Sequence, residues 1–213
     1  MLLTFALGLY LFFSGFLLNR LEIDVFNNIK ISVNGFRNDK VVLIVIDALR
    51  FDFLAENTGN QDKHYINKMP FIQKLVKQFP DQALLFKGRA DPPTTTLQRL
   101  KSIVTGALPT FIDASTNFNS NASLKEDNLI SQAVRHGKRI GFMGDDTWQA
   151  LFGADSFKVC NHPFPSFDVW DLHTVDNGVI EHLFPALNYS NWDILIAHFL
   201  GVDHVGHRYV SLN

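Results

Sequence analysis

The sequence predicts an α/β protein whose mostly parallel sheet carries helices on both faces. Residues 41–46 (VVLIVI) form an apolar run without polar alternation, which is typical of a central parallel strand buried on both faces. Two further strand-like runs follow, at 139–143 and at 192–200. Segments with helical spacing of apolar residues separate these runs, and such alternation favours a parallel sheet with right-handed crossovers.

Four helices are expected from their end signals. Proline fits the first turn of a helix, threonine its N-cap and glycine its end. The first expected helix begins at Pro70, and the second has Thr96 as its cap and stops at Gly106. The third covers about 125–136 and ends at Gly137, and the fourth covers about 174–184 and stops before Pro185.

The first 18 residues carry no charged side chain. As a helix they would be roughly 27 Å long, close to the ~30 Å hydrocarbon core of a bilayer. We therefore expect a signal-anchor or transmembrane helix over 1–19 and a polar connector over 20–40. A cleaved signal peptide is the alternative, but the run has no basic start and no clear small-x-small cleavage site.

Composition excludes some classes of protein. The net charge of −2 excludes a strongly basic nucleic-acid surface, and the single cysteine, Cys160, excludes an internal disulfide framework. Two Asn-x-Ser sequons, at Asn121 and Asn188, are candidate glycosylation sites and fit a luminal domain after a hydrophobic leader.

Carboxylates follow the predicted strands. Asp47, Asp203 and the pair Asp145 and Asp146 each stand just past a strand end. Ligands collect at the carboxyl ends of parallel strands, and clustered carboxylates there favour a bound cation. The alternative is that these aspartates only cap helices, and it weighs more for Asp145 and Asp146.

Asp203 and His207 are four residues apart, so on a helical turn they point the same way. Carboxylate and imidazole together suit Zn²⁺, with Mn²⁺ as the alternative. His204 is another possible ligand, ranked below His207. His198, inside the predicted strand, is interpreted as a packed core histidine.

Thr96 is the candidate nucleophile, with Thr94 and Thr95 as alternatives. A hydroxyl attacks phosphorus only when a metal or a base activates it, and a helix N-terminus adds N–H donors for phosphoryl oxygens. The plain alternative is a threonine-rich N-cap without chemistry.

The chain resembles the metal-dependent alkaline phosphatase superfamily, in which a strand-end aspartate is followed by a threonine ten residues before a helix glycine and then by Asp-x-x-x-His. Within it the chain is similar to the glycosylphosphatidylinositol (GPI) ethanolamine phosphate transferases, of the third-mannose type more than of the second-mannose type. The segments that carry the resemblance are IDALRFDF (46–53), DPPTTTLQRLKSIVTGALPTFIDA (91–114), EDNLI (126–130), FMGDDTW (142–148), TVDNG (174–178) and WDILIAHFLGVDHVGH (192–207).

The resemblance implies transfer of phosphoethanolamine from phosphatidylethanolamine to a mannose of the GPI precursor, at the endoplasmic reticulum membrane with a luminal catalytic domain. Two divalent ions, zinc or manganese, would be held by Asp47 with Thr96 and by Asp203 with His207, and Thr96 would carry the phosphoethanolamine. Arg99, Asp145 and Asp146 are candidate substrate-binding residues. A small multi-spanning stabilising subunit is the implied partner, and no nucleic acid is expected.

The family pattern also includes a later Asp-His-Gly strand end, a later histidine and a multi-spanning region, which this sequence does not show. Residues 41–213 are therefore interpreted as the N-terminal part of a catalytic domain. Two alternatives stay open: another metal-dependent phosphodiesterase, and a catalytically inactive fragment. A sulfatase would need a Cys- or Ser-x-Pro-x-Arg segment, which is missing.

Overall fold

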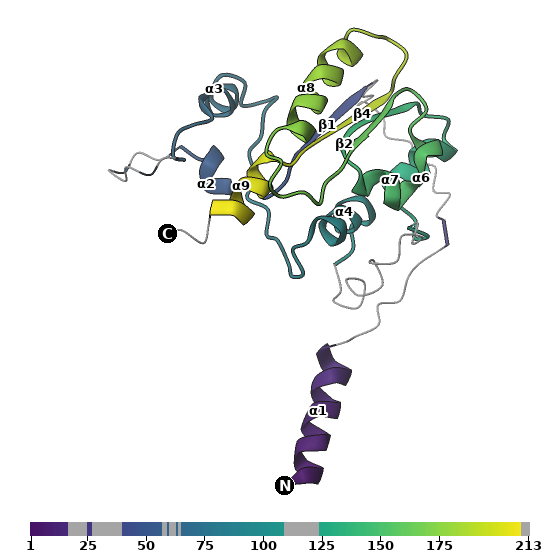
Figure 1. Cartoon of the computed structure of the whole chain (residues 1–213). Coiled ribbons are helices and arrows are strands. Elements are labelled where there is room, and N and C mark those ends of the chain that lie inside the picture. The colour runs from purple at the N-terminus through teal and green to yellow at the C-terminus, as the bar shows by residue number, and fades with distance from the viewer. Residues whose placement is uncertain are drawn as a thin grey trace. The chain divides into compact units, whose positions relative to one another are not determined.

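The structure is a computed structural model of the chain, and it describes residues 1–16, 25–26, 40–56, 59, 63, 65–108 and 124–209 (Figure 1). The chain divides into two compact units, one that joins Met1–Asp47 to Asp91–Asn213 and one formed by Ala48–Ala90. The expected segments 1–19, 20–40 and 41–213 stay predictions, and most of the connector lies outside the described residues.

The first unit contains a parallel sheet, which confirms the predicted fold class. Its strand order is β1-β4-β2-β3, and every pair is parallel. The three expected strands form close to their predicted bounds, and a short fourth strand, β3, was not predicted because it is only NHPF with a central proline. The strands are β1 (Val41–Ile46), β2 (Ile140–Asp145), β3 (Asn161–Phe164) and β4 (Ile194–Phe199).

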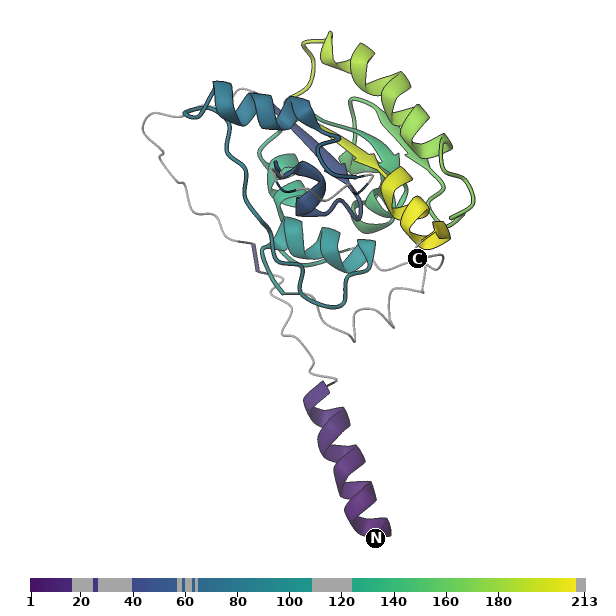
Figure 2. The same cartoon turned by 90° about the vertical axis from the view of Figure 1, so that its left-hand side faces the viewer.

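Helices cover both faces of this sheet, as predicted (Figures 1 and 2). On one face, α4 (Thr96–Thr105), α6 (Leu129–Arg135) and α7 (Thr147–Phe152) pack around the buried Phe142 and Ile196. On the other face, α8 (Thr174–Leu187) packs against Met143 and Ala197. The turn η1 (Ala154–Ser156) follows α7, and α9 (Gly201–Tyr209) follows β4.

The prediction that residues 41–46 form a central strand is wrong for the part of the chain that the structure describes. There β1 pairs with β4 alone and lies at the edge of the sheet. As a result Val42 and Ile44 remain 40% and 54% exposed. An apolar run marks a strand, but composition does not decide which position that strand takes in the sheet.

The helix expected to stop before Pro185 continues through it to Leu187. Proline usually ends a helix because it lacks an N–H donor. Here the helix is held by its buried Val179 and Leu183, and the indole N–H of Trp192 donates to the carbonyl of Ala186 at 2.9 Å. Tertiary contacts therefore extend the helix past the point where local sequence would end it.

The ends of two other helices follow their sequence signals. Gly106 is the C-cap of α4 with φ of 71°, the left-handed region that glycine adopts without strain. Asn128 caps α6 by accepting the N–H of Ser131 at 2.9 Å, so this helix starts at Leu129 instead of near 125.

The apolar N-terminus forms α1 (Leu2–Phe16), a helix of 15 residues. In the part of the chain that the structure describes, no helix combines the length and apolar character needed to cross a bilayer. The expected transmembrane helix over 1–19 is therefore not supported, and its last three residues lie outside the described ranges.

The second unit contains α2 (Phe51–Leu54) and α3 (Pro70–Gln78), and the predicted helix start at Pro70 is confirmed. The amide of Gln73 donates to the carbonyl of Leu54 at 3.3 Å, and Lys77 pairs with Glu56 at 2.6 Å. These contacts between helices give the unit its own internal packing.

Candidate metal centre

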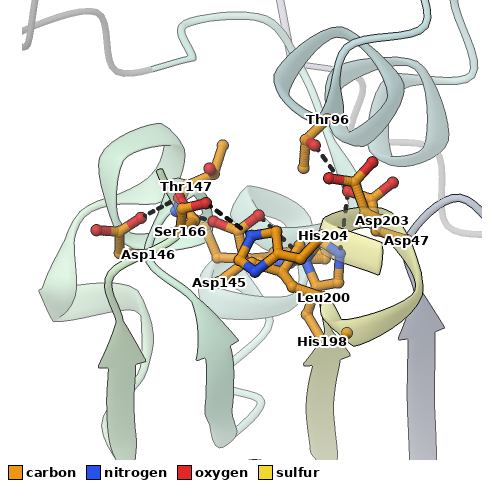
Figure 3. Close-up of polar contacts among 12 residues, drawn as sticks. Asp47, Thr96, Asp145, Asp146, Thr147, Ser166, His198, Leu200, Asp203 and His204 are labelled. Carbon is orange, nitrogen blue, oxygen red and sulfur yellow. Dashed lines mark hydrogen bonds and ion pairs between the residues drawn. The ribbon is translucent and has the colours of Figure 1, made fainter. Parts of the chain in front are cut away.

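The side chain of Asp47 starts the site at the carboxyl end of β1. Its backbone N–H donates to the carbonyl of Phe199 at 3.0 Å, so the sheet ladder fixes the residue just past the strand. Its Oδ2 accepts a hydrogen bond from the hydroxyl of Thr96 at 2.7 Å. Figure 3 shows both groups above the arrowheads of the strands, at the edge where parallel sheets bind ligands.

Thr96 is the first residue of α4, and Thr95 is the N-cap, so the prediction that Thr96 caps this helix is wrong. The backbone of Thr95 is extended and its hydroxyl bonds the side chain of Gln98. Thr94 and Thr95 are exposed, whereas Thr96 is half-buried. Of the three candidate hydroxyls, the one of Thr96 is the hydroxyl that reaches Asp47.

Asp145 lies at the carboxyl end of β2, where only 1% of it is exposed. Its Oδ1 accepts the N–H of Thr147 at 2.7 Å, and its Oδ2 lies 3.8 Å from Nδ1 of His198. Asp145 thus caps the start of α7 while it turns its second oxygen towards the cluster. The contact with Thr147 fits the helix-cap interpretation, and the second oxygen makes Asp145 a candidate ligand as well.

Asp146 turns away from that cluster. Its Oδ1 accepts the hydroxyl of Ser166 at 2.7 Å. Burial raises the pKa of the Asp146 carboxyl, and the charge of Asp145 adds to the rise while the hydrogen bond from Ser166 opposes it. Of the two adjacent aspartates, Asp145 therefore belongs to the cluster and Asp146 holds the loop that contains Ser166.

Asp203 and His207 lie on α9, four residues apart as the sequence predicted. Nε2 of His207 is 3.5 Å from Oδ2 of Asp203, but the His207 side chain is 63% exposed. Burial raises the pKa of the Asp203 carboxyl, and the nearby charge of Asp47 raises it further. Figure 3 shows Asp203 beside Asp47, so these two carboxylates repel each other where a cation would stabilise both.

His204 is buried, and both of its ring nitrogens face backbone carbonyls. Nδ1 lies 2.7 Å from the carbonyl of Asp171, and Nε2 lies 3.1 Å from that of Ser166. With both nitrogens occupied in this way, the ring has no lone pair directed at a cation. His204 instead fastens α9 to the loop before α8.

His198 is fully buried, as a core histidine should be, but its ring stands between two carboxylates. The indole N–H of Trp148 donates to Nδ1 at 3.0 Å. An indole only donates, so Nδ1 is the acceptor and the neutral ring carries its proton on Nε2. Nε2 lies 3.7 Å from Oδ2 of Asp47 and has no hydrogen-bond partner among the described residues.

Ligand atoms of Asp47, Asp145 and His198 all lie within 4.8 Å of one another. The two carboxylates and the adjacent hydroxyl of Thr96 form an oxygen-rich set that fits a divalent cation. His198 would add a nitrogen ligand only if its proton moved to Nδ1, which breaks the bond from Trp148. The chain therefore presents a possible metal triad in which the two acids fit an ion directly.

One member of this cluster, His198, received no metal role from sequence alone. A histidine inside an apolar strand is usually packing, and only its distances of 3.7 Å to Asp47 and 3.8 Å to Asp145 indicate otherwise. His198 lies opposite Gly144 in the sheet. At Gly144, φ is 131° and an added Cβ would lie 2.2 Å from the carbonyl oxygen of His198. Glycine there lets β2 approach β4 closely. Arg99 donates to the carbonyl of Asp91 at 3.2 Å, and its substrate role stays a prediction, as does that of Asp146.

Three relatives show what the chain is similar to. The human catalytic subunit of GPI ethanolamine phosphate transferase 3 is 44% identical over 96% of this chain and 21% of its own length. GPI ethanolamine phosphate transferase 3 of Eremothecium gossypii is 46% identical over 93% of this chain and 20% of its own. The human catalytic subunit of GPI ethanolamine phosphate transferase 2 is 44% identical over 79% of this chain and 16% of its own.

No protein-family model matches the chain, and no solved structure matches it significantly. The chain spans about a fifth of the length of the curated type 3 relatives it matches. Over the segment that it spans, the chain is therefore a homologue of the GPI ethanolamine phosphate transferases that carry the type 3 name.

Proposed function

We propose that this chain supplies the nucleophile and the cation-binding edge for transfer of phosphoethanolamine from phosphatidylethanolamine to the GPI precursor. One observation carries the proposal: the hydroxyl of Thr96 is held 2.7 Å from Asp47, and Asp47 is grouped in turn with the buried carboxylate of Asp145. The names of the homologues supply the reaction class.

The chemistry follows from these positions. The oxygen of Thr96 attacks the phosphorus of the donor lipid, and the bond from phosphorus to the diacylglycerol oxygen breaks. The proton of Thr96 passes to the carboxylate of Asp47 and from there to the departing oxygen, so that neutral diacylglycerol leaves. A mannose hydroxyl then attacks the phosphorus of the phosphoethanolamine ester of Thr96, gives its proton through Asp47 to the Thr96 oxygen, and frees the threonine for another cycle. The N-terminus of α4 directs backbone N–H groups at the phosphoryl oxygens.

Divalent ions complete the proposal. Asp47, Asp145 and Thr96 would hold one ion, with His198 as a conditional ligand, and Asp203 with His207 would contribute to a second. Such an ion, zinc or manganese, supplies a positive charge that lowers the pKa of a bound hydroxyl and stabilises phosphoryl oxygens. The two protein ligands at the second position are fewer than the three of a usual catalytic zinc site.

We propose that the acceptor is the third mannose of the GPI precursor, as in the type 3 assignment. Type 3 relatives match 96% and 93% of the chain at 44% and 46% identity, whereas type 2 relatives match 79% of it at 44% or 98% of it at 36%. We also propose an endoplasmic reticulum membrane location, a luminal site, a small multi-spanning partner subunit, and glycosylation at the exposed Asn188. The uncharged 18-residue N-terminus and the sequon support the location; Asn121 lies outside the described residues.

The test is a chimera in cells that lack the type 3 transferase. This chain replaces the matching segment of the human enzyme, and surface display of GPI-anchored proteins is measured. Thr96→Ala should abolish display, while Thr94→Ala, an exposed hydroxyl two residues away, should preserve it. Normal display with Thr96→Ala would refute the proposal.

Product analysis separates the alternatives. Transfer to glycan supports the transferase, whereas phosphoethanolamine released to water would favour a phosphodiesterase. A chimera that is made and localised normally but remains silent would favour a non-catalytic segment.

A further inference from the structure

A carboxylate on α8 contacts the beginning of α9, although the two lie 24 residues apart. Oδ1 of Asp176 accepts the backbone N–H groups of Leu200 at 2.8 Å and Gly201 at 3.0 Å. Asp176 belongs to the segment 174–178 (TVDNG), to which the proposed chemistry gives no role. We propose that Asp176 is a positioning residue that fixes the N-terminus of α9 and so places Asp203 beside Asp47.

The helix needs this cap from outside. The first N–H groups of any helix lack partners within it, and they attract negative charge. Leu200, the residue before α9, has no side-chain oxygen with which to accept them. The carboxylate of Asp176 takes over the role that a serine or aspartate N-cap would ordinarily have.

The contact is closely fitted. A Cβ added to Gly201 would lie 2.5 Å from Oδ2 of Asp176 and 3.4 Å from the carbonyl of Leu172. The helix that bears Asp176, α8, also packs closely against β3, because a Cβ on Gly178 would lie 2.2 Å from the ring of Phe164. Glycines at 178 and 201 therefore permit α8, β3 and the start of α9 to pack at these separations.

The consequence for the site follows from sequence distance. Asp203 stands two residues after Gly201, within the first turn of α9, so the cap sets where its carboxylate lies. His204 also fixes this turn, through the carbonyls of Ser166 and Asp171. The role of Asp176 in placing α9 is inferred from these contacts alone. The effect of that placement on cation binding rests on the proposed function.

Amide hydrogen exchange of the whole 213-residue chain in detergent tests the placement. Asp176→Ala should speed exchange at Leu200, Gly201 and the rest of α9 by about tenfold, since a lost cap weakens its helix. Asp176→Asn retains an acceptor oxygen and should recover part of the protection. Unchanged exchange in α9 with Asp176→Ala would overturn the proposal.

Asn128→Ala is the matched control. The Oδ1 of Asn128 accepts the N–H of Ser131 at the start of α6, at 2.9 Å. This variant also loses a helix cap, but exchange should rise at the start of α6 and remain normal in α9. Equal loss of α9 protection in both variants would mean a general loss of stability and would contradict a specific role for Asp176.

Mn²⁺ titration of the same variants gives the second readout. Asp176→Ala should weaken binding by about tenfold, as expected when a partner that orients a ligand is removed, and Asn128→Ala should not. If the unaltered chain binds no Mn²⁺, the cation-binding part of the proposed function fails, while the exchange result still decides the role of Asp176.

Discussion

The two halves of the candidate metal centre differ in how they are held. Asp47 and Asp145 end strands of one sheet, and the hydroxyl of Thr96 already bonds Asp47. Asp203 and His207 lie on a helix after the sheet, and His207 is 63% exposed. Ladder hydrogen bonds fix the strand-end half, whereas the α9 half depends on caps supplied by other segments. The strand-end half is therefore the preorganised one.

The largest effect is expected from Asp47, because it belongs to the strand-end half and faces both Thr96 and Asp203. Asp47→Asn removes the charge that accepts the proton of Thr96, and loss of such a group lowers rates roughly 10²–10⁴-fold. Transfer by the chimera, measured with a lipid donor, should fall by this factor. Thr94→Ala is the control, and transfer within threefold of normal for Asp47→Asn would place the base elsewhere.

The second largest effect, a loss of stability, should come from a change at Trp148, whose indole orients His198. Trp148→Phe leaves a buried ring nitrogen unpaired, which costs about 1–3 kcal/mol in the free energy of unfolding. Zn²⁺ affinity of the chain should not fall, because Nδ1 is then free to carry the proton and Nε2 to bind the ion. Urea unfolding and zinc titration measure the two quantities.

Trp192→Phe is the matched control for Trp148. Its indole also donates one hydrogen bond, at 2.9 Å to Ala186, but on the opposite face of the sheet. Stability should fall in this variant too, without a change in zinc affinity. A drop in zinc affinity confined to Trp148→Phe would show that the indole-bound form of His198 is needed for binding.

His207 should contribute less within this chain. Its imidazole is exposed and 3.5 Å from Asp203, so it is not held in a binding position. We expect His207→Ala to change Mn²⁺ affinity of the chain by less than about threefold, since an exposed, unfixed side chain gains little when it is ordered by a ligand. His136→Ala, at another exposed histidine, controls for surface binding. A tenfold loss of Mn²⁺ affinity in His207→Ala would mean that the α9 half contributes to binding as strongly as the strand-end half.

The places of Asp47 and Thr96 at the ends of their elements could be predicted from sequence for a physical reason. A run such as VVLIVI followed by Asp47 places its side chain through backbone geometry alone, and the helix start near Thr96 is encoded locally. The short distance between Thr96 and Asp47 needs the sheet and α4 to pack, and before the structure only the family resemblance implied it.

What the sequence could not predict depends on contacts between distant residues. His198 was interpreted as core because nothing local reveals Trp148 on one nitrogen and Asp47 near the other. The edge position of β1 depends on which strands pair, and the continuation of α8 past Pro185 depends on Trp192. Local rules name the elements, and long-range packing decides where they lie.

The smallest expected effect is on the free energy of unfolding at acid pH, and it arises from Asp171 at the N-terminal end of α8. Hydrogen bonds from the hydroxyl and the N–H of Thr174, and from the N–H of His173, lower the pKa of Asp171 from 3.8 to about 2. A carboxyl whose pKa is lower in the folded state stabilises the protein above its unfolded pKa, and this contribution disappears as the pH falls through the folded pKa.

The free energy of unfolding of the chain should therefore exceed that of Asp171→Ala above pH 4. The difference between the two proteins should shrink steadily from pH 4 to pH 2. Because the carboxyl is well exposed, solvent screening keeps the effect small. Urea unfolding of both proteins across this pH range measures it. A gap that stays constant down to pH 2 would mean that the charge of Asp171 does not hold the start of α8, and that the cap acts through packing alone.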